Sequence, residues 1–365
     1  MNPKPNIVNL PVYKPGKPIE EVKKELGLNE VIKLASNENP YGAAPSARAA
    51  ITAELDNLFL YPDGSASELT AALAKHLGVG NEQIIFGCGS DEIIALIARA
   101  FFLPGDETIM ADQTFSVYKS NADIEGAVTI EVPLKNGTHD LDAMLAKISD
   151  KTKIIWICNP NNPTGTIVPE DALVTFLNAV PSSVMVVLDE AYYEYVTDLS
   201  YTNGINLLDT YPNLVVLRTF SKIYGLAALR IGYGVASPQV ITLINQVREP
   251  FNTTRLAQVG AIAALSDQDY VQQCRKLNSE GIVQLQAEFK RLGLNSFPAH
   301  GNFIMVDVRK PAHEVFDLLL RRGIIVRAGF QLYPTYVRVT VGSAEQNTAF
   351  IAALEQVIAE QEIRA

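Results

Sequence analysis

The hydrophobic positions along the first two thirds of the chain alternate between two periods. Apolar residues at every third or fourth position predict helices at 67–77, 91–102, 115–124, 141–148 and 170–179. Short apolar segments between them predict strands at 83–86, 107–110, 128–132, 153–158, 184–188, 214–217 and 231–235. Apolar strands that alternate with helices are typical of a sheet buried on both faces. The pattern therefore predicts an α/β fold with a mainly parallel sheet covered by helices.

The pattern changes at about residue 237. A long helical region covers 238–291 with breaks, and it is followed by a mixture of shorter elements. These are strands at 303–306, 324–327 and 336–341 and helices at 313–321 and 344–360. The first 42 residues are rich in Pro, Asn and Lys and show little periodicity. We therefore predict an arm (1–42) that joins the small domain, a large cofactor-binding domain (43–245) and a small α+β domain (246–365).

Composition narrows the class of protein. The chain has 365 residues, of which 48% are hydrophobic and 19% are charged, as expected for a soluble globular protein. A net charge of −10 argues against nucleic-acid and anionic-membrane partners. Three cysteines and four histidines are scattered, so we expect neither disulfides nor a metal site. The polar start of the chain lacks the apolar segment of a signal peptide, which favours a cytoplasmic location.

A lysine stands close to the end of one predicted strand. The apolar residues 214–217 are followed by Thr219, Ser221 and Lys222, with Arg230 eight residues farther on. An amine among hydroxyl groups and a guanidinium suits a Schiff base to a phosphorylated aldehyde. A lysine after a strand is more often a solvated surface charge, so this segment needs support from the rest of the chain.

Two other predicted strands are followed by polar residues. Asp189 follows four apolar strand residues, where a carboxylate is costly to bury without a cationic partner. A protonated pyridine nitrogen would be such a partner; a metal ion or an exposed strand end are the alternatives. Asn162 lies in a turn stiffened by two prolines and a glycine, where it either binds a ligand oxygen or caps the turn.

A loop of small residues precedes the helix predicted at 91–102. Gly89, Ser90 and Asp91 would let backbone N–H groups approach an anion at the start of the helix. Ser90 or Asp91 could equally be a simple helix cap. Taken together, the lysine, the carboxylate, the phosphate donors and the polar turn match the groups that pyridoxal phosphate requires from a protein.

The order Asn162, Asp189, Tyr192, Lys222, Arg230 resembles the fold-type I aminotransferases of class I and II. Within them, the chain is similar to the histidinol-phosphate aminotransferases over nearly its whole length. The matching motifs are IKLASNENP (32–40), YPDG (61–64), PNNPTG (160–165), DEAY (189–192), the stretch 219–230 and VRVTVG (337–342).

The resemblance implies pyridoxal 5′-phosphate as the cofactor and assigns roles around it. Lys222 would form the Schiff base and later move the proton. Asp189 would pair with the pyridinium nitrogen, and Asn162 and Tyr192 would bond the phenolic oxygen. Phe115, at a position where the family commonly has tyrosine, would stack on the ring. The cofactor phosphate would be bound by Gly89, Ser90, Asp91, Thr219, Ser221 and Arg230. Tyr61, which resembles the family tyrosine that enters the partner subunit's site, would also contact the cofactor.

For the substrates, the resemblance implies anion recognition at a site shared by two subunits of a homodimer. Arg338 matches the family's carboxylate-binding arginine, and Arg327 would meet a phosphate or a second carboxylate. Tyr13, Asn37 and Tyr61 would lie beside them. Alternatively, Arg327 is a surface charge at the end of a strand and has no role in binding.

The implied reaction is ping-pong transamination between histidinol phosphate and 2-oxoglutarate, which gives imidazole acetol phosphate and glutamate in histidine biosynthesis. An aromatic-amino-acid aminotransferase, acting on phenylalanine or tyrosine, is the main alternative because the loop 329–334 is variable among relatives. A phosphothreonine-type decarboxylase and a non-catalytic sensor are weaker alternatives; the sensor usually needs a DNA-binding module, for which we expect no room.

Overall fold

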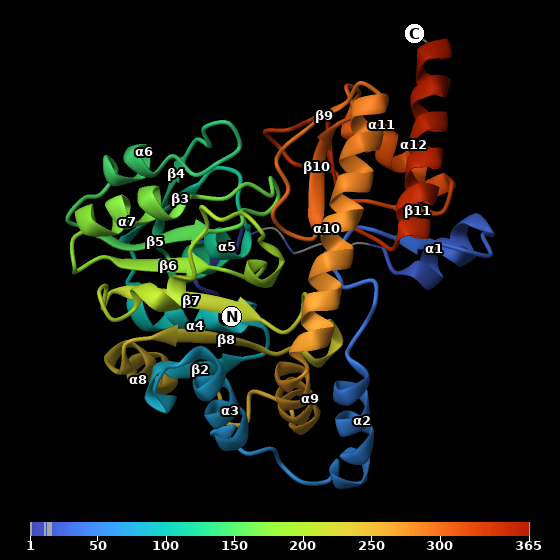
Figure 1. Ribbon diagram of the computed structural model, residues 1–365. Helices are drawn as coiled ribbons and strands as arrows, with labels where there is room; N and C mark the ends of the chain where they lie inside the picture. The colour runs from blue at the N-terminus through green and yellow to red at the C-terminus, as the bar shows by residue number, and fades with distance from the viewer. Residues whose placement is uncertain (1, 11, 13–16, 365) are drawn as a thin grey trace.

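The computed structural model describes residues 2–10, 12 and 17–364 and contains a large seven-stranded sheet beside a smaller three-stranded one (Figure 1). The large sheet has the order β2-β8-β7-β6-β5-β3-β4. Its strands are β2 (Ile84–Gly87), β3 (Glu107–Ala111), β4 (Val128–Val132), β5 (Thr152–Cys158), β6 (Met185–Asp189), β7 (Leu214–Thr219) and β8 (Gly232–Ala236). All neighbours are parallel except β8, which is antiparallel to both β2 and β7.

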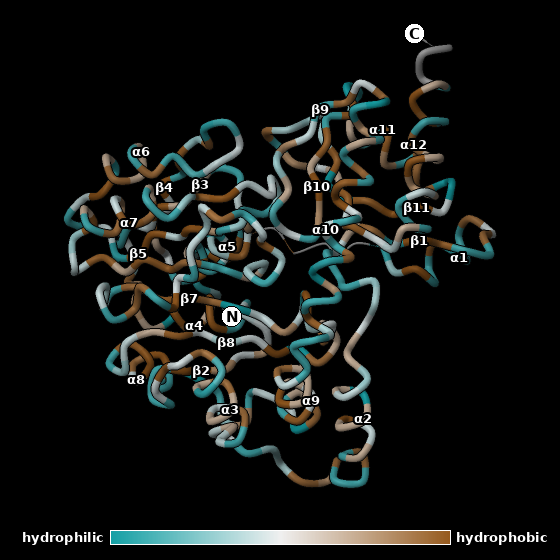
Figure 2. The backbone as a smooth tube through the Cα atoms, in the orientation of Figure 1, coloured by the Kyte–Doolittle hydropathy of each residue, from teal (hydrophilic) through white to brown (hydrophobic). Residues whose placement is uncertain are grey.

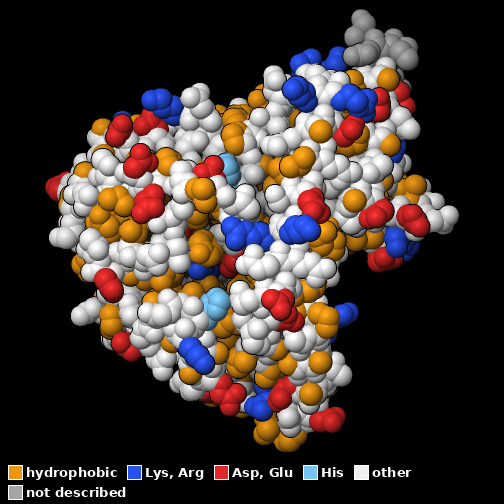
Figure 3. Space-filling view, in the orientation of Figure 1, with side chains coloured by type: hydrophobic (Ala, Val, Ile, Leu, Met, Phe, Trp, Pro, Cys, Tyr) orange, Lys and Arg blue, Asp and Glu red, His pale blue; other side chains and the backbone are white. Residues whose placement is uncertain are grey.

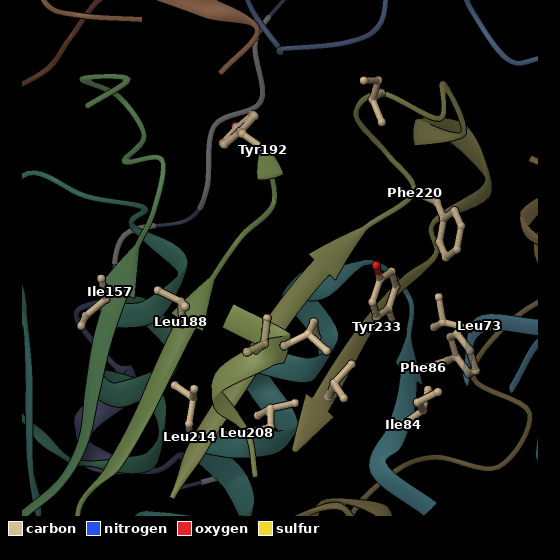
Figure 4. Packing of buried hydrophobic residues seen from close by; sticks show 14 of the residues in the cluster. Leu73, Ile84, Phe86, Ile157, Leu188, Tyr192, Leu208, Leu214, Phe220 and Tyr233 are labelled. Carbon is tan, nitrogen blue, oxygen red and sulfur yellow. The ribbon is translucent and has the colours of Figure 1, made fainter. Parts of the chain in front are cut away.

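Both faces of the large sheet are covered. The helices around it are α2 (Pro45–Ala53), α3 (Ser67–Leu77), α4 (Ser90–Phe101), α5 (Val117–Glu125), α6 (Leu141–Leu145), α7 (Glu170–Ala179), α8 (Pro238–Gln246) and α9 (Arg255–Ser266). Ile155 and Ile157 of β5 pack into one buried cluster, with residues of α3, α7 and α9 (Figure 4). Ile154 and Trp156 pack into a second cluster with residues of α4, α5 and α8. Because neighbouring residues of one strand enter opposite cores, the central strands β5, β6 and β7 are apolar over most of their length; Figure 2 shows such a brown stretch at β5.

The C-terminal part forms the smaller layer. Its sheet places β10 (Phe303–Asp307) between β9 (Asn295–Ser296) and β12 (Tyr336–Thr340), with antiparallel pairing. The helices here are α10 (Gln268–Arg291), α11 (Ala312–Arg321) and α12 (Ala344–Arg364). From the N-terminal arm, β1 (Ile32–Lys33) pairs in parallel with β11 (Ile324–Ile325). The arm therefore contributes a strand to the C-terminal part of the molecule, while the domain boundaries at 42 and 245 remain predictions.

The predicted α/β fold with a mainly parallel sheet is confirmed. Two helices were not predicted, α2 and α1 (Ile19–Leu26). The arm does carry a helical signal, since Ile19, Val22 and Leu26 share one face, and Val22 is buried against Ala35 and Ile325. The predicted strand 324–327 is shorter than expected, and Arg327 forms only an isolated bridge with Arg338.

The visible surface is mixed in charge. Figure 3 shows acidic and basic side chains interspersed over the face seen in Figure 1. Within the described ranges, none of the helices is long and apolar enough to cross a bilayer.

Candidate active site

The predicted site residues follow strand ends that meet at one edge of the large sheet. Asn162 follows β5, Asp189 ends β6 and Lys222 follows β7, and these three strands are neighbours and parallel. Arg230 instead precedes β8. Because β8 is antiparallel, its first residue pairs with the last residues of β2 and β7, so Arg230 lies at the same edge. The topology thus places the three carboxyl ends and Arg230 together.

Lys222 is half-buried beside Tyr192. Its Nζ lies 3.4 Å from the carbonyl oxygen of Ser36, to which it donates, and 5.5 Å from the centre of the Tyr192 ring. Burial, with the nearby positive charge of Arg338, lowers the pKa of Lys222 to about 8. An appreciable fraction of the amine is therefore neutral near physiological pH, as nucleophilic attack and proton transfer require.

Asp189 is buried, with 2% of its surface exposed. The backbone N–H of Ala191 donates to its Oδ1 at 3.1 Å, and the hydroxyl of Tyr118 donates to its Oδ2 at 2.6 Å. Burial raises the pKa of Asp189 to about 6, and the two hydrogen bonds act in the opposite direction. The site therefore holds a carboxylate whose desolvation a bound cation would relieve.

An anion cradle forms where α4 begins. Gly89 has φ +80°, and a Cβ there would lie 2.5 Å from Nη2 of Arg230. Gly232 likewise packs closely against the start of α4, since a Cβ there would lie 2.5 Å from the backbone N of Ser90. Arg230 donates to Ser221 Oγ at 3.2 Å and lies 3.5 Å from the carboxylate of Asp91. Backbone N–H groups, a guanidinium and a hydroxyl thus converge at the start of a helix.

The remaining cradle residue, Thr219, is buried and oriented by its neighbours. Its hydroxyl accepts the backbone N–H of Ser221 at 3.0 Å, which fixes the turn between β7 and Lys222. The structure therefore brings together all the residues predicted to bind the cofactor phosphate from the same subunit.

The two arginines predicted to bind substrate are cross-strand partners. Arg327 and Arg338 exchange two backbone hydrogen bonds, of 3.0 and 2.8 Å. Directly paired residues project to the same face, so the two side chains are neighbours. Arg338 reaches across to donate to Asn162 Oδ1, and it also donates to the carbonyl oxygen of Ala35 at 2.7 Å. The small sheet thereby contacts the turn that follows β5.

Asn37 links the arm to Tyr192. Its side-chain nitrogen donates to the Tyr192 hydroxyl at 3.0 Å, and its Oδ1 accepts from Thr340 Oγ1 at 3.0 Å. Asn302 donates to the backbone carbonyl oxygen of Asn37 at 3.0 Å. Asn37 has φ +55°, a conformation that asparagine tolerates better than most residues. These bonds hold the Tyr192 ring beside Lys222.

The ring contacts of Phe115 and Tyr61 are with other aromatic side chains. Phe115 follows β3 and packs against the second core cluster, with its ring edge-on to Tyr118 at 5.6 Å. Tyr61 is 79% exposed and stacks on Phe251 at 4.8 Å, and within the described residues it makes no hydrogen bond to the other site residues. Tyr13 lies outside the described residues.

Sequence reasoning missed two groups. Tyr118, which bonds Asp189, lies in α5 three residues after Phe115, and this spacing was the available signal. Arg218 and Glu190 form a buried ion pair of 2.7 Å, one residue before Thr219 and one after Asp189. The positions of Arg218 and Glu190 next to predicted site residues were the available signal in the sequence. That the two side chains meet follows only from the pairing of strand β6 with strand β7.

Comparison with known proteins gives a consistent result. The model of the family "Aminotransferase class I and II" matches residues 29–354. A histidinol-phosphate aminotransferase of Brevibacillus brevis is 55% identical over 359 residues, covering 98% of this chain and 99% of its own. One of Bacillus subtilis is 51% identical, covering 98% and 100%. A histidinol-phosphate aminotransferase of Sinorhizobium meliloti, solved in complex with pyridoxal 5′-phosphate, superposes with a TM-score of 0.91 at 29% identity, covering 98% of this chain and 97% of its own.

Proposed function

The chain belongs to the class I and II aminotransferase family, and on this basis we propose that it transfers an amino group between histidinol phosphate and 2-oxoglutarate, using pyridoxal 5′-phosphate. The observation that carries the proposal is a sequence identity above 50% to histidinol-phosphate aminotransferases over essentially the full chain. The convergence of Lys222, Asp189 and Arg230 at one edge of the sheet supports it independently.

The residues at this edge fit the cofactor. A side chain at Gly89 or Gly232 would fill the cradle, and Arg230 supplies a charge for a phosphate. Asp189 is a buried carboxylate in need of a cationic partner, which a pyridinium nitrogen would provide. When bound, pyridoxal phosphate supplies an electrophilic carbon for the amine and a ring that accepts electron density from the reacting carbon.

Each side chain at this edge would have its own role in the reaction. Lys222, with its pKa near 8, would take the proton from the α-carbon of the amine and return it later. Asn162 and Tyr192 would bond the phenolic oxygen, and Phe115 would cover one face of the ring. Asp91 would act through its backbone and by orienting Arg230, since its carboxylate faces the guanidinium. Because the amino donor and the 2-oxo acid acceptor would use one site in turn, ping-pong kinetics are expected.

The paired arginines would select the substrates. Arg338 would bind the carboxylate of the amino acid, and Arg327 beside it would bind the phosphate of histidinol phosphate or the second carboxylate of 2-oxoglutarate. Steady-state comparison of histidinol phosphate, phenylalanine and tyrosine as donors, with 2-oxoglutarate as acceptor, tests this function. A preference for the aromatic amino acids would instead favour the aromatic aminotransferase.

Arg327→Ala should damage the phosphate substrate selectively. We expect kcat/KM for histidinol phosphate to fall by about 10- to 100-fold, since a hydrogen bond to a charged group contributes about 1.5–3 kcal/mol. For phenylalanine the loss should stay within about threefold. Arg321→Ala, an exposed arginine at the end of α11, is the matched control and should leave both values unchanged. Equal losses for both substrates would rule out a phosphate role for Arg327.

We also infer that the enzyme acts as a homodimer, through an apolar segment at residues 55–61. Leu58, Phe59 and Tyr61 are 60%, 82% and 79% exposed, and Phe251 extends the segment. An exposed apolar cluster of this kind marks an interaction surface. Tyr61 would then enter the site of the partner, which explains its position away from Lys222 in a single subunit. The cytoplasmic location stays a prediction from the sequence.

Phe59→Asp should therefore yield a monomer with little activity, because a charge placed in an apolar interface is costly to desolvate. Analytical ultracentrifugation measures the association state, and transamination is assayed on the same fractions. Leu199→Asp, at an isolated residue that is 99% exposed, is the control and should remain dimeric and active. Sedimentation of the wild type as an active monomer would contradict the assignment of Tyr61.

A further inference from the structure

Tyr118 belongs to the second core cluster and contacts Asp189 from within it. The residue is fully buried, and its hydroxyl donates to Asp189 Oδ2 at 2.6 Å. It comes from α5, whereas Asp189 ends β6, so the bond connects a covering helix to the sheet. A buried hydroxyl bonded to an ionised carboxylate is a charge-assisted hydrogen bond, which is stronger than a neutral one.

The ring of Tyr118 is held in place by a chain of contacts. It stacks on Trp156 of β5, with 4.9 Å between ring centres and an angle of 11°. The indole N–H of Trp156 donates to Thr108 Oγ1 at 2.8 Å, and Thr108 donates to the carbonyl oxygen of Ile154 at 2.9 Å. Every member of this chain is buried. The hydroxyl is therefore presented to Asp189 from a fixed position.

The other groups around Asp189 make this bond important. Cys158 faces it from β5, Asp91 from α4 and Glu190 from the next position along the chain, and an ionised form of any of these would oppose a negative charge on Asp189. Burial also opposes the charge. In the described part of the chain, Asp189 Oδ1 accepts from the Ala191 N–H and Oδ2 accepts from the Tyr118 hydroxyl.

We propose that Tyr118 is a positioning residue for the cofactor: its hydroxyl holds Asp189 as an oriented anion for the ring nitrogen. This rests on the proposed function, because it requires a ligand with a basic ring nitrogen at Asp189. Without the hydroxyl, Asp189 loses a hydrogen bond that favours its charged form, so its pKa rises. Asp189 would then be neutral up to a higher pH, and it would be freer to turn away from the ring.

The test is the affinity of Tyr118→Phe for pyridoxal phosphate, compared with an analogue in which C–H replaces the ring nitrogen. Phenylalanine keeps the stack on Trp156 and removes only the hydroxyl. We expect the Kd for pyridoxal phosphate to rise about tenfold, the effect of one charge-assisted hydrogen bond. The Kd for the analogue should change less than about twofold, because it has no ring nitrogen to pair with Asp189.

The pH dependence of binding gives a second readout. Affinity for pyridoxal phosphate falls on the acid side as Asp189 becomes protonated. In Tyr118→Phe this fall should move to higher pH by about one unit. Tyr211→Phe is the matched control: its hydroxyl donates to Asn178 Oδ1 at 2.9 Å, at the opposite end of β7 from Lys222. It should leave both the affinity and its pH profile as in the wild type.

An Asp189→Asn background separates positioning from a general structural role. There, adding Tyr118→Phe should change the affinity for pyridoxal phosphate less than about twofold, because the anion is already absent. Equal losses for pyridoxal phosphate and the analogue, or an undiminished loss in the Asp189→Asn background, would overturn the proposal. If the wild-type chain bound neither compound, the proposed function itself would fail, and this inference with it.

Discussion

Replacing Lys222 with alanine should reduce kcat for transamination by about 10⁴-fold or more. General acid–base catalysis by a positioned group alone contributes about 10²–10⁴-fold, and the covalent bond that Lys222 is proposed to form with the cofactor would be lost as well. The low pKa of Lys222, near 8, arises from burial and from Arg338, so it belongs to this position in the fold. Steady-state kinetics with histidinol phosphate and 2-oxoglutarate measures the loss.

Two further variants isolate the chemistry of the amine. Lys222→Arg keeps a cation of similar length, but a guanidinium is always protonated and cannot take up a proton, so it should be as inactive as alanine. Lys276→Ala, at an exposed lysine of α10 whose side chain is 77% exposed, should retain wild-type activity. Activity in Lys222→Arg within tenfold of the wild type would mean that a neutral amine is not required at this position.

Arg218→Met should give the largest loss of stability, about 3–5 kcal/mol, because it leaves a charged carboxylate buried without its partner. Glu190 is fully buried, and Arg218 donates to its Oε2 from both Nε and Nη2, at 3.0 and 2.7 Å. The guanidinium also lies 3.6 Å from the centre of the Tyr193 ring. The shift of the urea midpoint at an unchanged m value measures the effect.

Adding Glu190→Gln to Arg218→Met should restore stability. In Arg218→Met/Glu190→Gln the buried negative charge is gone, while the backbone N–H of Gly204, now 2.9 Å from Oε1, can still donate to the amide. Much of the loss should therefore be recovered. Arg291→Met removes an exposed arginine with comparable ion pairs to Glu288 and Glu355, and it should cost far less. A double variant no more stable than Arg218→Met would show that packing of the arginine, and not the stranded charge, is responsible.

Much of the fold could be predicted because its signals are local. Helices α3 and α7 and strand β4 have the predicted bounds, since each combines a clear period with flanking glycine or proline. Helix α1 was missed because its apolar face is only three residues long and lies among prolines and lysines. The predicted helix 141–148 ends at Leu145, since the following residues form turns.

The sequence by itself determined the order of the strands along the chain, the residues at their ends and the resemblance that links Lys222 to a cofactor. Only the tertiary structure decided which of these residues meet. Arg230 reaches the site because β8 runs antiparallel, Arg327 adjoins Arg338 through one bridge, and Tyr118 reaches Asp189 from a helix across the core. The physical reason is that periodicity and motifs report on neighbours along the chain. Strand direction, register and side-chain reach depend on pairing between residues far apart in sequence.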